Sequence, residues 1–297
     1  MMLTDNPLWD KLEQGQRVVC VELDPPVDDT IQPFLDGVAA FQAAGADAVT
    51  IADSPVGRPR ADSSLLACKL KRELGVETLP HMTCRDRNEI ATKALLLGLS
   101  IEGVHNVLLV TGDPVPGERR SDVKSVFNFN SRKLARYVAA LNEEVLRTPF
   151  RVFAALDINA VNFPAELRRA REKERCGVVG FLTQPVLSAE ALENLKRARE
   201  SLSGKILGGV FPVVSHKNAL FLNEQVSGVR VCPEIIQLYQ GADREAGEAL
   251  AHRISARVIE AIAPYTDGAY LMTPFQRVGL MTKLIAFAQE TMSCTTN

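Results

Sequence analysis

The sequence predicts a single-domain (β/α)8 barrel, a TIM barrel, that spans residues 1–297. Eight short apolar runs alternate with stretches of helical periodicity, and repeated strand–helix units of this kind close into a parallel barrel. A chain of 297 residues, 46% of them hydrophobic, is large enough for one such barrel. The expected strands are Arg17–Leu23, Asp47–Ala52, Glu77–Thr83, His105–Thr111, Arg151–Leu156, Val178–Thr183, Ile206–Val214 and Ala269–Thr273.

Glycine and serine residues mark the ends of the helices expected between these runs. Gly45, Gly75 and Gly98 each follow a helical stretch at the position where a C-cap glycine is favoured, and Ser188 is an expected N-cap. The expected helices are Thr30–Ala44, Ala61–Leu74, Asp86–Leu97, Ser131–Arg147, Pro164–Arg175, Ser188–Leu202, His216–Gln225, Pro233–Leu238, Arg244–Ala263 and Gly279–Thr291. The apolar stripe of Ser131–Arg147 comprises Leu134, Val138, Leu141 and Val145.

Composition excludes several classes of function. The net charge of −2 gives no basic field for nucleic acid or an anionic membrane, and no apolar stretch approaches the length of a membrane span. The polar segment Met1–Asp10 shows no signal-peptide pattern, and the six cysteines form no CxxC pair, so a reducing cytoplasm is expected. His81 and Cys84 form a lone HxxC, for which a buried thiol is favoured over a metal ligand because no second ligand pair is present.

Polar residues lie at or just beyond the ends of nearly all the expected strands. Such barrels carry their chemistry at the C-terminal ends of the strands, so a ring of polar residues there is a candidate active site. The ring comprises Glu22, Thr50, His81, Asp113, Asp157, Gln184, Ser215 and Gln276.

Glu22 ends a strand that is otherwise apolar. Side chains alternate along a strand, so Glu22 shares a face with Val18 and Cys20. If that face lines the barrel, desolvation raises the pKa of Glu22 and makes it a usable general acid near neutral pH. A salt bridge to a neighbouring loop is an equally weighted interpretation.

Asp113, His81 and Gln184 each have two interpretations. Asp113 could bind the N–H edge of a heterocycle such as a pterin or guanine, or could cap the turn before Pro114. His81 could be a base, a ligand or a hydrogen-bond donor to a cofactor, although a lone histidine is more often a satisfied core residue. Gln184 could hold a heterocycle or a carboxamide, or could be a buried turn residue.

Two further segments are candidates for cofactor contacts. The irregular loop Gly112–Phe129 is long, and long loops at this end of a barrel are typical of lids or binding elements. The charged segment Glu166–Arg175 reads mainly as a solvated helix face, but one of its cations could bind a phosphate. The sequence contains no GxGxxG or Walker motif, which excludes Rossmann and P-loop sites for nucleotides.

Four motifs in order resemble the methylenetetrahydrofolate reductase family of bacterial flavoproteins. These motifs are Glu22–Pro26 (ELDPP), Pro80–Cys84 (PHMTC), Thr111–Asp113 (TGD) and Thr183–Pro185 (TQP), and the resemblance extends from Arg17 to Glu290. The ELDPP form is similar to a branch that is often fused to a homocysteine methyltransferase domain, and we expect no such domain within these residues.

The resemblance implies an FAD-bearing barrel that acts in one-carbon metabolism and methionine biosynthesis. Such an enzyme reduces 5,10-methylenetetrahydrofolate to 5-methyltetrahydrofolate with NADH or NADPH, in two separate half-reactions of ping-pong form. The resemblance does not distinguish the two nicotinamides. It implies a homo-oligomer, dimer or tetramer, with possible association with a methyltransferase or an electron-transfer partner.

Individual roles follow from the resemblance residue by residue. Glu22 matches the general acid that protonates folate N5 and opens the imidazolidine ring, and Asp113 matches the aspartate that holds the pterin and lowers the flavin potential. The positions that match FAD contacts are Thr50, His81, Thr111, Gly112, Asn162, Glu166, Arg169 and Lys173, with Lys173 at the phosphates. The positions that match folate contacts are Asp113, Gln184, Leu222 and Arg277.

Three positions depart from the family pattern. Thr111 replaces a cation beside the flavin, Glu172 stands where a basic residue is common near the phosphates, and Leu222 replaces an aromatic that stacks on the pterin. Two other functions therefore stay open. One is a different flavin-barrel dehydrogenase of the proline or amine type. The other is a barrel subunit that binds folate or flavin, or relays electrons, within a larger complex.

Overall fold

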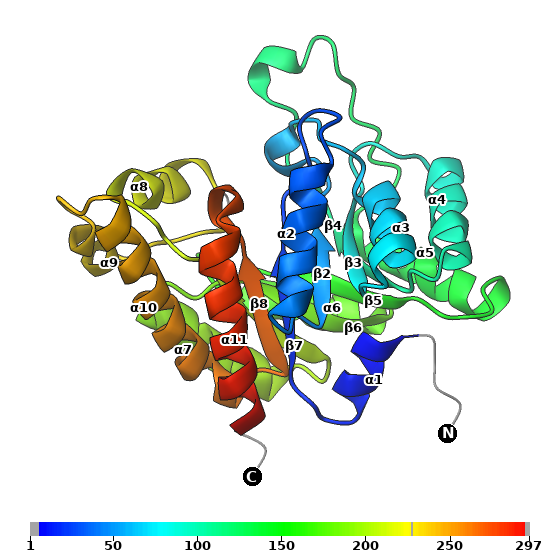
Figure 1. Cartoon of the computed structure of the whole chain (residues 1–297). Helices are drawn as coiled ribbons and strands as arrows, with labels where there is room; N and C mark the ends of the chain where they lie inside the picture. Colours follow the sequence, from blue (N-terminus) through cyan, green and yellow to red (C-terminus); the bar gives the residue numbers. More distant parts are fainter. Residues whose placement is uncertain (1–5, 227, 295–297) are drawn as a thin grey trace.

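Eight parallel strands form a closed barrel in chain order, with the last strand paired to the first, which confirms the predicted architecture (Figure 1). The computed structural model describes residues 6–226 and 228–294, so residues 1–5 of the polar N-terminal segment lie outside the described part. The strands are β1 (Val18–Glu22), β2 (Ala48–Ile51), β3 (Thr78–Thr83), β4 (Asn106–Val110), β5 (Arg151–Leu156), β6 (Val178–Pro185), β7 (Lys205–Val210) and β8 (Gly268–Met272).

Helices cover the outside of the barrel and connect its strands (Figure 1). They are α1 (Pro7–Glu13), α2 (Gln32–Ala43), α3 (Ser63–Leu74), α4 (Glu89–Ile101), α5 (Ser131–Glu144), α6 (Phe163–Arg175), α7 (Ala189–Ser201), α8 (His216–Gln225), α9 (Pro233–Leu238), α10 (Arg244–Ile262) and α11 (Val278–Cys294). Over the described residues, no helix is both long and apolar enough to cross a membrane.

Most of the predicted end signals act as expected. Gly45 and Gly75 follow α2 and α3 with positive φ angles of 99° and 64°, and Gly177 follows α6 in the same way with a φ of 99°. The Ser188 side chain accepts a hydrogen bond from the amide of Ala191 at 3.1 Å and caps α7.

The C-terminal ends of α4 and α5 were predicted wrongly. α4 continues through Gly98 to Ile101, and the left-handed glycine that follows it is Gly103, with a φ of 74°. A glycine within a helix costs little where the next turn packs well, and the buried Leu99 supplies that packing. α5 stops at Glu144, so Val145 leaves the predicted apolar stripe and is 44% exposed.

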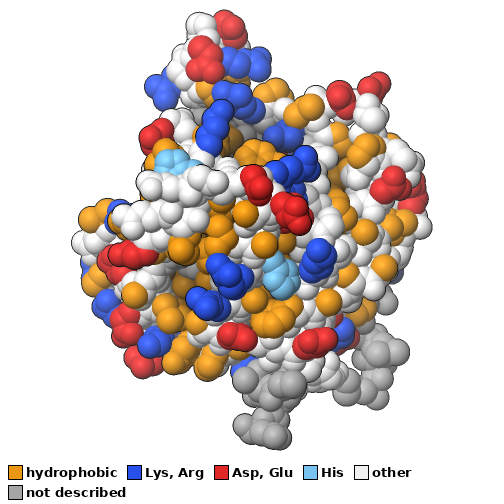
Figure 2. Space-filling model, turned by 60° about the vertical axis from the view of Figure 1, so that its left-hand side comes forward, with side chains coloured by type: hydrophobic (Ala, Val, Ile, Leu, Met, Phe, Trp, Pro, Cys, Tyr) orange, Lys and Arg blue, Asp and Glu red, His pale blue; other side chains and the backbone are white. Residues whose placement is uncertain are grey.

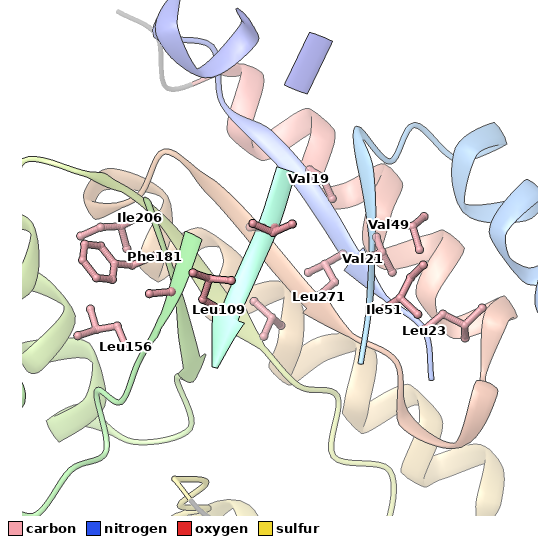
Figure 3. Close-up of a cluster of buried hydrophobic side chains, with 14 of the residues drawn as sticks. Val19, Val21, Leu23, Val49, Ile51, Leu109, Leu156, Phe181, Ile206 and Leu271 are labelled. Atoms are coloured by element: carbon pink, nitrogen blue, oxygen red, sulfur yellow. The ribbon is translucent and has the colours of Figure 1, made fainter. Parts of the chain in front are cut away.

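Strand alternation divides the core into two layers. Outward-facing residues such as Val19, Val49 and Leu271 pack beneath the helices in the cluster that Figure 3 shows. Inward-facing residues fill the barrel itself, where Val18 and Cys20 lie in the same cluster as Phe153. The face of β1 that carries Val18 and Cys20 therefore lines the interior, which is the condition that the sequence analysis left open for Glu22.

The short helix α1 closes the N-terminal end of the barrel and was not predicted. It lies below the strands in Figure 1, and its buried side chains Leu8, Trp9 and Leu12 join the inner cluster. The Trp9 ring meets Phe153 edge-on at a centroid distance of 6.1 Å. Asn6 before the helix exchanges side-chain hydrogen bonds of 2.9 and 3.0 Å with Asn106 of β4. The interior is thus sealed at the end opposite to the candidate site.

Leu12→Ala is expected to destabilise the protein by about 2–5 kcal/mol, because it opens a cavity in the inner core beneath the strands. Leu65→Ala is the matched control, since Leu65 of α3 is 68% exposed, and a change within about 0.5 kcal/mol is expected. Urea unfolding of both variants measures the difference. Equal stability of the two variants would show that α1 does not contribute to the core.

Candidate active site

Strand alternation places four polar side chains of β1, β2, β3 and β8 on the inner face of the barrel. Glu22 and Thr50 occupy paired positions on β1 and β2, and each continues an inward-facing series that includes Cys20 and Ala48. His81 follows the inward-facing Leu79 by two residues on β3, and Tyr270 shares the inner face of β8. Glu22, Thr50 and His81, which the sequence analysis assigned to one ring of strand-end residues, thus lie on one inner surface of the barrel.

Glu22 lies at the mouth of the barrel, where its side chain is 20% exposed, and two neighbouring side chains contact its carboxyl. The Tyr270 hydroxyl donates a hydrogen bond to Oε2 of Glu22, and Nε2 of His81 lies 3.4 Å from the same oxygen. The pKa of Glu22 is raised to about 7: burial makes the largest contribution, repulsion by Asp24 adds to it, and the Tyr270 hydrogen bond opposes both. The desolvated carboxyl that the alternation predicts is therefore present, and the Glu22 carboxyl can hold a proton near neutral pH.

His81 is a neutral neighbour of this carboxyl. Burial lowers its pKa to about 4, against a smaller opposing effect of Asp53. Its Nε2 is buried and has no hydrogen-bond partner among the described residues, while its backbone carbonyl accepts a hydrogen bond of 2.8 Å from Ser63. The histidine is thus a core residue with one unsatisfied ring nitrogen.

Tyr270 was not among the residues predicted for the site. It is 6% exposed, and burial together with the Glu22 carboxyl raises its pKa well above the ordinary value. Thr50 lies beside the phenol and lowers the pKa of Tyr270, against these two effects. The alternation of Gly268, Tyr270 and Met272 on one face of β8 was the signal that could have identified it.

The predicted TGD motif lies on the rim of the barrel and links the β4–α5 loop to the β2–α3 loop. Oδ2 of Asp113 accepts a hydrogen bond of 2.7 Å from the amide of Val56, and both Thr111 and Asp113 are exposed. Gly112 has a φ of 92°, and a Cβ there would lie 3.0 Å from Cβ of Thr83 and 3.2 Å from Cβ of Arg85. The tight turn requires glycine, and the Asp113 carboxylate holds the β2–α3 loop rather than its own turn.

Two arginines of the β3–α4 loop, which the sequence analysis did not select, organise this rim. Arg85 is 3% exposed and donates a hydrogen bond of 2.9 Å to the carbonyl of Asp113. Arg87 bridges Asp53 and Asp62 at 2.9 and 2.8 Å. Both follow the PHMTC motif directly, and this proximity was the available signal.

Four of the predicted FAD contacts, of which Lys173 was expected at the phosphates, lie on α6 or at its N-cap. Nζ of Lys173 donates to the carbonyl of Ala155 at 2.7 Å and lies 3.9 Å from Oε1 of Glu166, and burial lowers the pKa of Lys173. Arg169 pairs with Oε2 of Glu166 at 2.8 Å. Asn162 caps the helix by accepting a hydrogen bond of 3.0 Å from the amide of Ala165.

The predicted folate contacts lie in three different settings. Gln184 packs under the loop at Gly228, where a glycine Cβ would meet Cγ of Gln184 at 3.1 Å. Arg277 pairs with Glu248 of α10 at 2.9 Å. Leu222 is 3% exposed within a separate apolar cluster, whereas the adjacent Phe221 is 48% exposed. The structure thus places the Leu222 side chain in the interior rather than at an open surface.

The rim loop predicted as a lid rises from the end of the barrel opposite α1 (Figure 1). It contains one short 3-10 turn, Gly117–Arg119. The projection carries both acidic and basic side chains, and basic and acidic groups are interspersed over the face in Figure 2. Two hollows of about 610 and 650 Å³ lie beside α8 and α10, and neither is lined by Glu22, Thr50, His81 or Tyr270.

A closed (β/α)8 barrel with a buried acid among polar groups at its strand ends is the arrangement in which barrel enzymes carry their active sites. A sequence model described as methylenetetrahydrofolate reductase matches residues 8–269. The chain therefore belongs to the methylenetetrahydrofolate reductase family, which confirms the resemblance found from the four motifs.

Curated relatives carry the same family description at low identity. The 5,10-methylenetetrahydrofolate reductase of Escherichia coli is 22% identical over 241 residues, 78% of this chain and 77% of that protein. The protein of the same description from Buchnera aphidicola is 22% identical over 194 residues, 62% of this chain. A probable methylenetetrahydrofolate reductase (NADPH) of Caenorhabditis elegans is 23% identical over 158 residues. The matched regions span 60% of the Buchnera protein and 23% of the nematode protein.

Solved structures share the fold. A Clostridium thermocellum protein, described as uncharacterized and as binding two copies of 5-methyl-5,6,7,8-tetrahydrofolic acid, is 13% identical with a TM-score of 0.66, over 97% of this chain and 99% of that one. Tryptophan synthase of Mycobacterium tuberculosis matches with a TM-score of 0.55 and 13% identity, over 98% and 99% of the two chains. At these identities the likeness shows the barrel fold.

The buried Glu22 carboxyl is expected to make stability depend on pH. Its pKa of about 7 in the fold lies above the ordinary value of 4.5, so its stabilising contribution is complete below about pH 4.5 and is lost as pH rises through 7. Relative to Glu22→Gln, the wild type is expected to lose roughly 3 kcal/mol at most, at about 1.4 kcal/mol per pH unit.

Urea unfolding of both proteins at pH 5 and pH 8 measures this difference. The His81 titration is common to the two proteins and largely cancels. Glu102→Gln, a change in an ion pair with Arg72 on the outer surface, serves as the control without this pH dependence. Parallel stability curves for wild type and Glu22→Gln would contradict a buried, protonated Glu22.

Proposed function

We propose that this protein reduces 5,10-methylenetetrahydrofolate to 5-methyltetrahydrofolate through a bound FAD, with NADH or NADPH as the hydride source and Glu22 as the general acid. The observation that carries the proposal is the largely buried Glu22 carboxyl at the C-terminal end of β1, whose pKa is raised to about 7. Family membership supports the substrate, since the curated relatives are described as methylenetetrahydrofolate reductases. The described folate binding of the Clostridium neighbour agrees with it.

The residues at the strand ends fit a flavin. Nε2 of His81 and Oγ1 of Thr273 are buried polar atoms without hydrogen-bond partners among the described residues. His81 lies near the end of β3 and Thr273 directly follows β8, where a ligand could satisfy them. Lys173 is a desolvated cation that uses one of its three N–H donors on Ala155, so a phosphate would relieve its burial. His81, Thr50 and Lys173 would hold the flavin, with Thr111, Gly112, Asn162, Glu166 and Arg169 as the remaining proposed contacts.

Bound FAD would accept hydride from the nicotinamide and pass it to the folate in two separate half-reactions. Glu22 holds the proton that ring opening of the folate requires. The one-carbon unit stays on N5 in the product, so ring opening breaks its bond to N10. The released N10 therefore ends with a proton, whichever of the two nitrogens is protonated first. Glu22 then regains its proton from water, which can reach it because its side chain is 20% exposed.

The folate would be held by groups on the rim. Asp113 uses Oδ2 on Val56, which leaves Oδ1 for the N–H edge of the pterin. Gln184 and Arg277 are proposed as further contacts, and Arg277 would exchange or share its partner Glu248. Leu222 would reach the folate only after rearrangement of α8, and the adjacent exposed Phe221 is a better-placed apolar group on the same helix.

The cellular setting is proposed from the family. We place the protein in the cytoplasm, in methionine biosynthesis, as a homodimer or homotetramer. A methyltransferase or an electron-transfer protein remains a candidate partner.

A second candidate function is a barrel subunit that binds folate or flavin without steady-state turnover. One observation favours it. Lys173, Arg169 and Asp113 each already have an internal partner, as they would in a protein that does not use them for catalysis. A different flavin-barrel dehydrogenase of the proline or amine type would leave the protonated Glu22 without a role.

The protein loaded with FAD is expected to show a bound-flavin absorbance that bleaches with NADH or NADPH under anaerobic conditions. The colour should return when methylenetetrahydrofolate is added, because the folate accepts the hydride. Stopped-flow absorbance with each substrate separately measures both steps. Failure to bind FAD would overturn the proposal, and bleaching without folate-dependent recovery would favour another flavin dehydrogenase.

Glu22→Gln is expected to retain reduction by the nicotinamide and to lose about 10²–10⁴-fold in the folate half-reaction, because only the second step needs the proton. Glu102→Gln, on the outer surface, is the matched control and should leave both rates unchanged. Single-turnover kinetics on the reduced and oxidised forms separates the two steps. Equal losses in both half-reactions would make Glu22 a structural residue.

A further inference from the structure

The Tyr270 hydroxyl reaches Glu22 from one layer deeper in the barrel. Tyr270 pairs in register with Cys20, whereas Glu22 pairs with Met272, so the phenol spans the two-residue offset between them. The phenol lies within the inner cluster, among Cys20, Leu79 and Leu207, and its ring is fixed by that packing. The hydroxyl donates to Oε2 of Glu22. The tyrosine ring is thus fixed by packing, and its hydroxyl holds one specific carboxyl oxygen of Glu22.

We propose that Tyr270 is a positioning residue that holds Glu22 through Oε2, so that the proton which Glu22 donates resides on Oε1. This inference rests on the proposed function, because it gives Tyr270 a role through the acid of that reaction. It adds a residue that the four motifs do not contain.

The other groups around the carboxyl do not supply this hydrogen bond. Nε2 of His81 lies 3.4 Å from Oε2 but forms no hydrogen bond with the described residues, and the imidazole is neutral at neutral pH. Asp24 can only repel the Glu22 carboxylate, and Arg60 compensates Asp24 at 3.6 Å. Thr50 acts on the phenol of Tyr270 rather than on the carboxyl.

The contact favours the carboxylate that remains after proton transfer. A hydrogen bond to the charged form lowers the pKa of the acid and opposes the effect of burial. Tyr270 keeps its own proton throughout, because its pKa lies well above the ordinary value. Tyr270 thus makes Glu22 a stronger acid than burial alone would allow, without entering the proton transfer.

Tyr270→Phe tests the proposal in the 297-residue chain, without flavin or folate. Loss of the donor is expected to raise the titration midpoint of Glu22 by about one pH unit, as for a hydrogen bond to a charged group. NMR of protein labelled with ¹³C at the glutamate carboxyls measures the midpoint, and the resonance missing from Glu22→Gln assigns the signal. Tyr239→Phe is the matched control, since Tyr239 is also buried and donates instead to the carbonyl of Val213.

A second measurement needs no change at Tyr270. In wild type labelled with ¹³C at tyrosine Cζ, the Tyr270 resonance should shift with the midpoint of Glu22, and this shift should vanish in Glu22→Gln. An unchanged Glu22 midpoint in Tyr270→Phe, or a Tyr270 resonance that ignores pH near 7, would overturn the proposal.

The pH profile of the folate half-reaction separates the inference from the function on which it rests. In Tyr270→Phe its alkaline limb should move upward by the same amount as the NMR midpoint, while the nicotinamide half-reaction stays unchanged. If the NMR midpoint moves and the folate profile does not, Glu22 is not the acid, and the proposed function fails although the Tyr270 contact is real. If neither moves, the positioning role itself fails.

Discussion

Desolvation inside a closed cylinder is the constraint on which the candidate site depends. The same burial raises the pKa of Glu22 to about 7 and lowers that of His81 to about 4. Between pH 4 and pH 7 the Glu22 carboxyl and the His81 imidazole are both mainly neutral. The 3.4 Å contact between Nε2 of His81 and Oε2 of Glu22 is therefore not an ion pair over most of this pH range. A neutral site with a dissociable proton suits an acid that must deliver that proton to a weakly basic nitrogen.

The dry interior is a property of the whole barrel. Helix α1 seals the far end with Leu8, Trp9 and Leu12, and inward-facing side chains such as Phe153 fill the cylinder above it. Water therefore reaches Glu22 from the strand-end side, the face at which barrel enzymes bind their substrates. The packing that stabilises the fold and the electrostatics that tune the acid have the same origin.

The barrel and the face of Glu22 were predictable because both follow from local periodicity. Alternation along VVCVE fixes which side chains point inward, and the order of eight strand–helix units leaves one closed topology. Tyr270 and Arg85 escaped prediction because their roles depend on contacts between distant strands and loops. Helix α1 escaped because seven residues carry too little periodicity to stand out.

The two halves of the candidate site differ in whether the groups proposed to contact a ligand already have hydrogen-bond partners. On β1, β2, β3 and β8 the groups are fixed by strands, and Nε2 of His81 still lacks a partner among the described residues. In the other half, Asp113 of the β4–α5 loop accepts a hydrogen bond from the Val56 amide, and Lys173 of α6 donates to the carbonyl of Ala155. A ligand gains the full hydrogen-bond energy at the first half, but it must exchange existing bonds at the second. Binding energy for the ring system should therefore come mainly from the barrel, and that for the phosphates and the rim contacts should be the smaller net part.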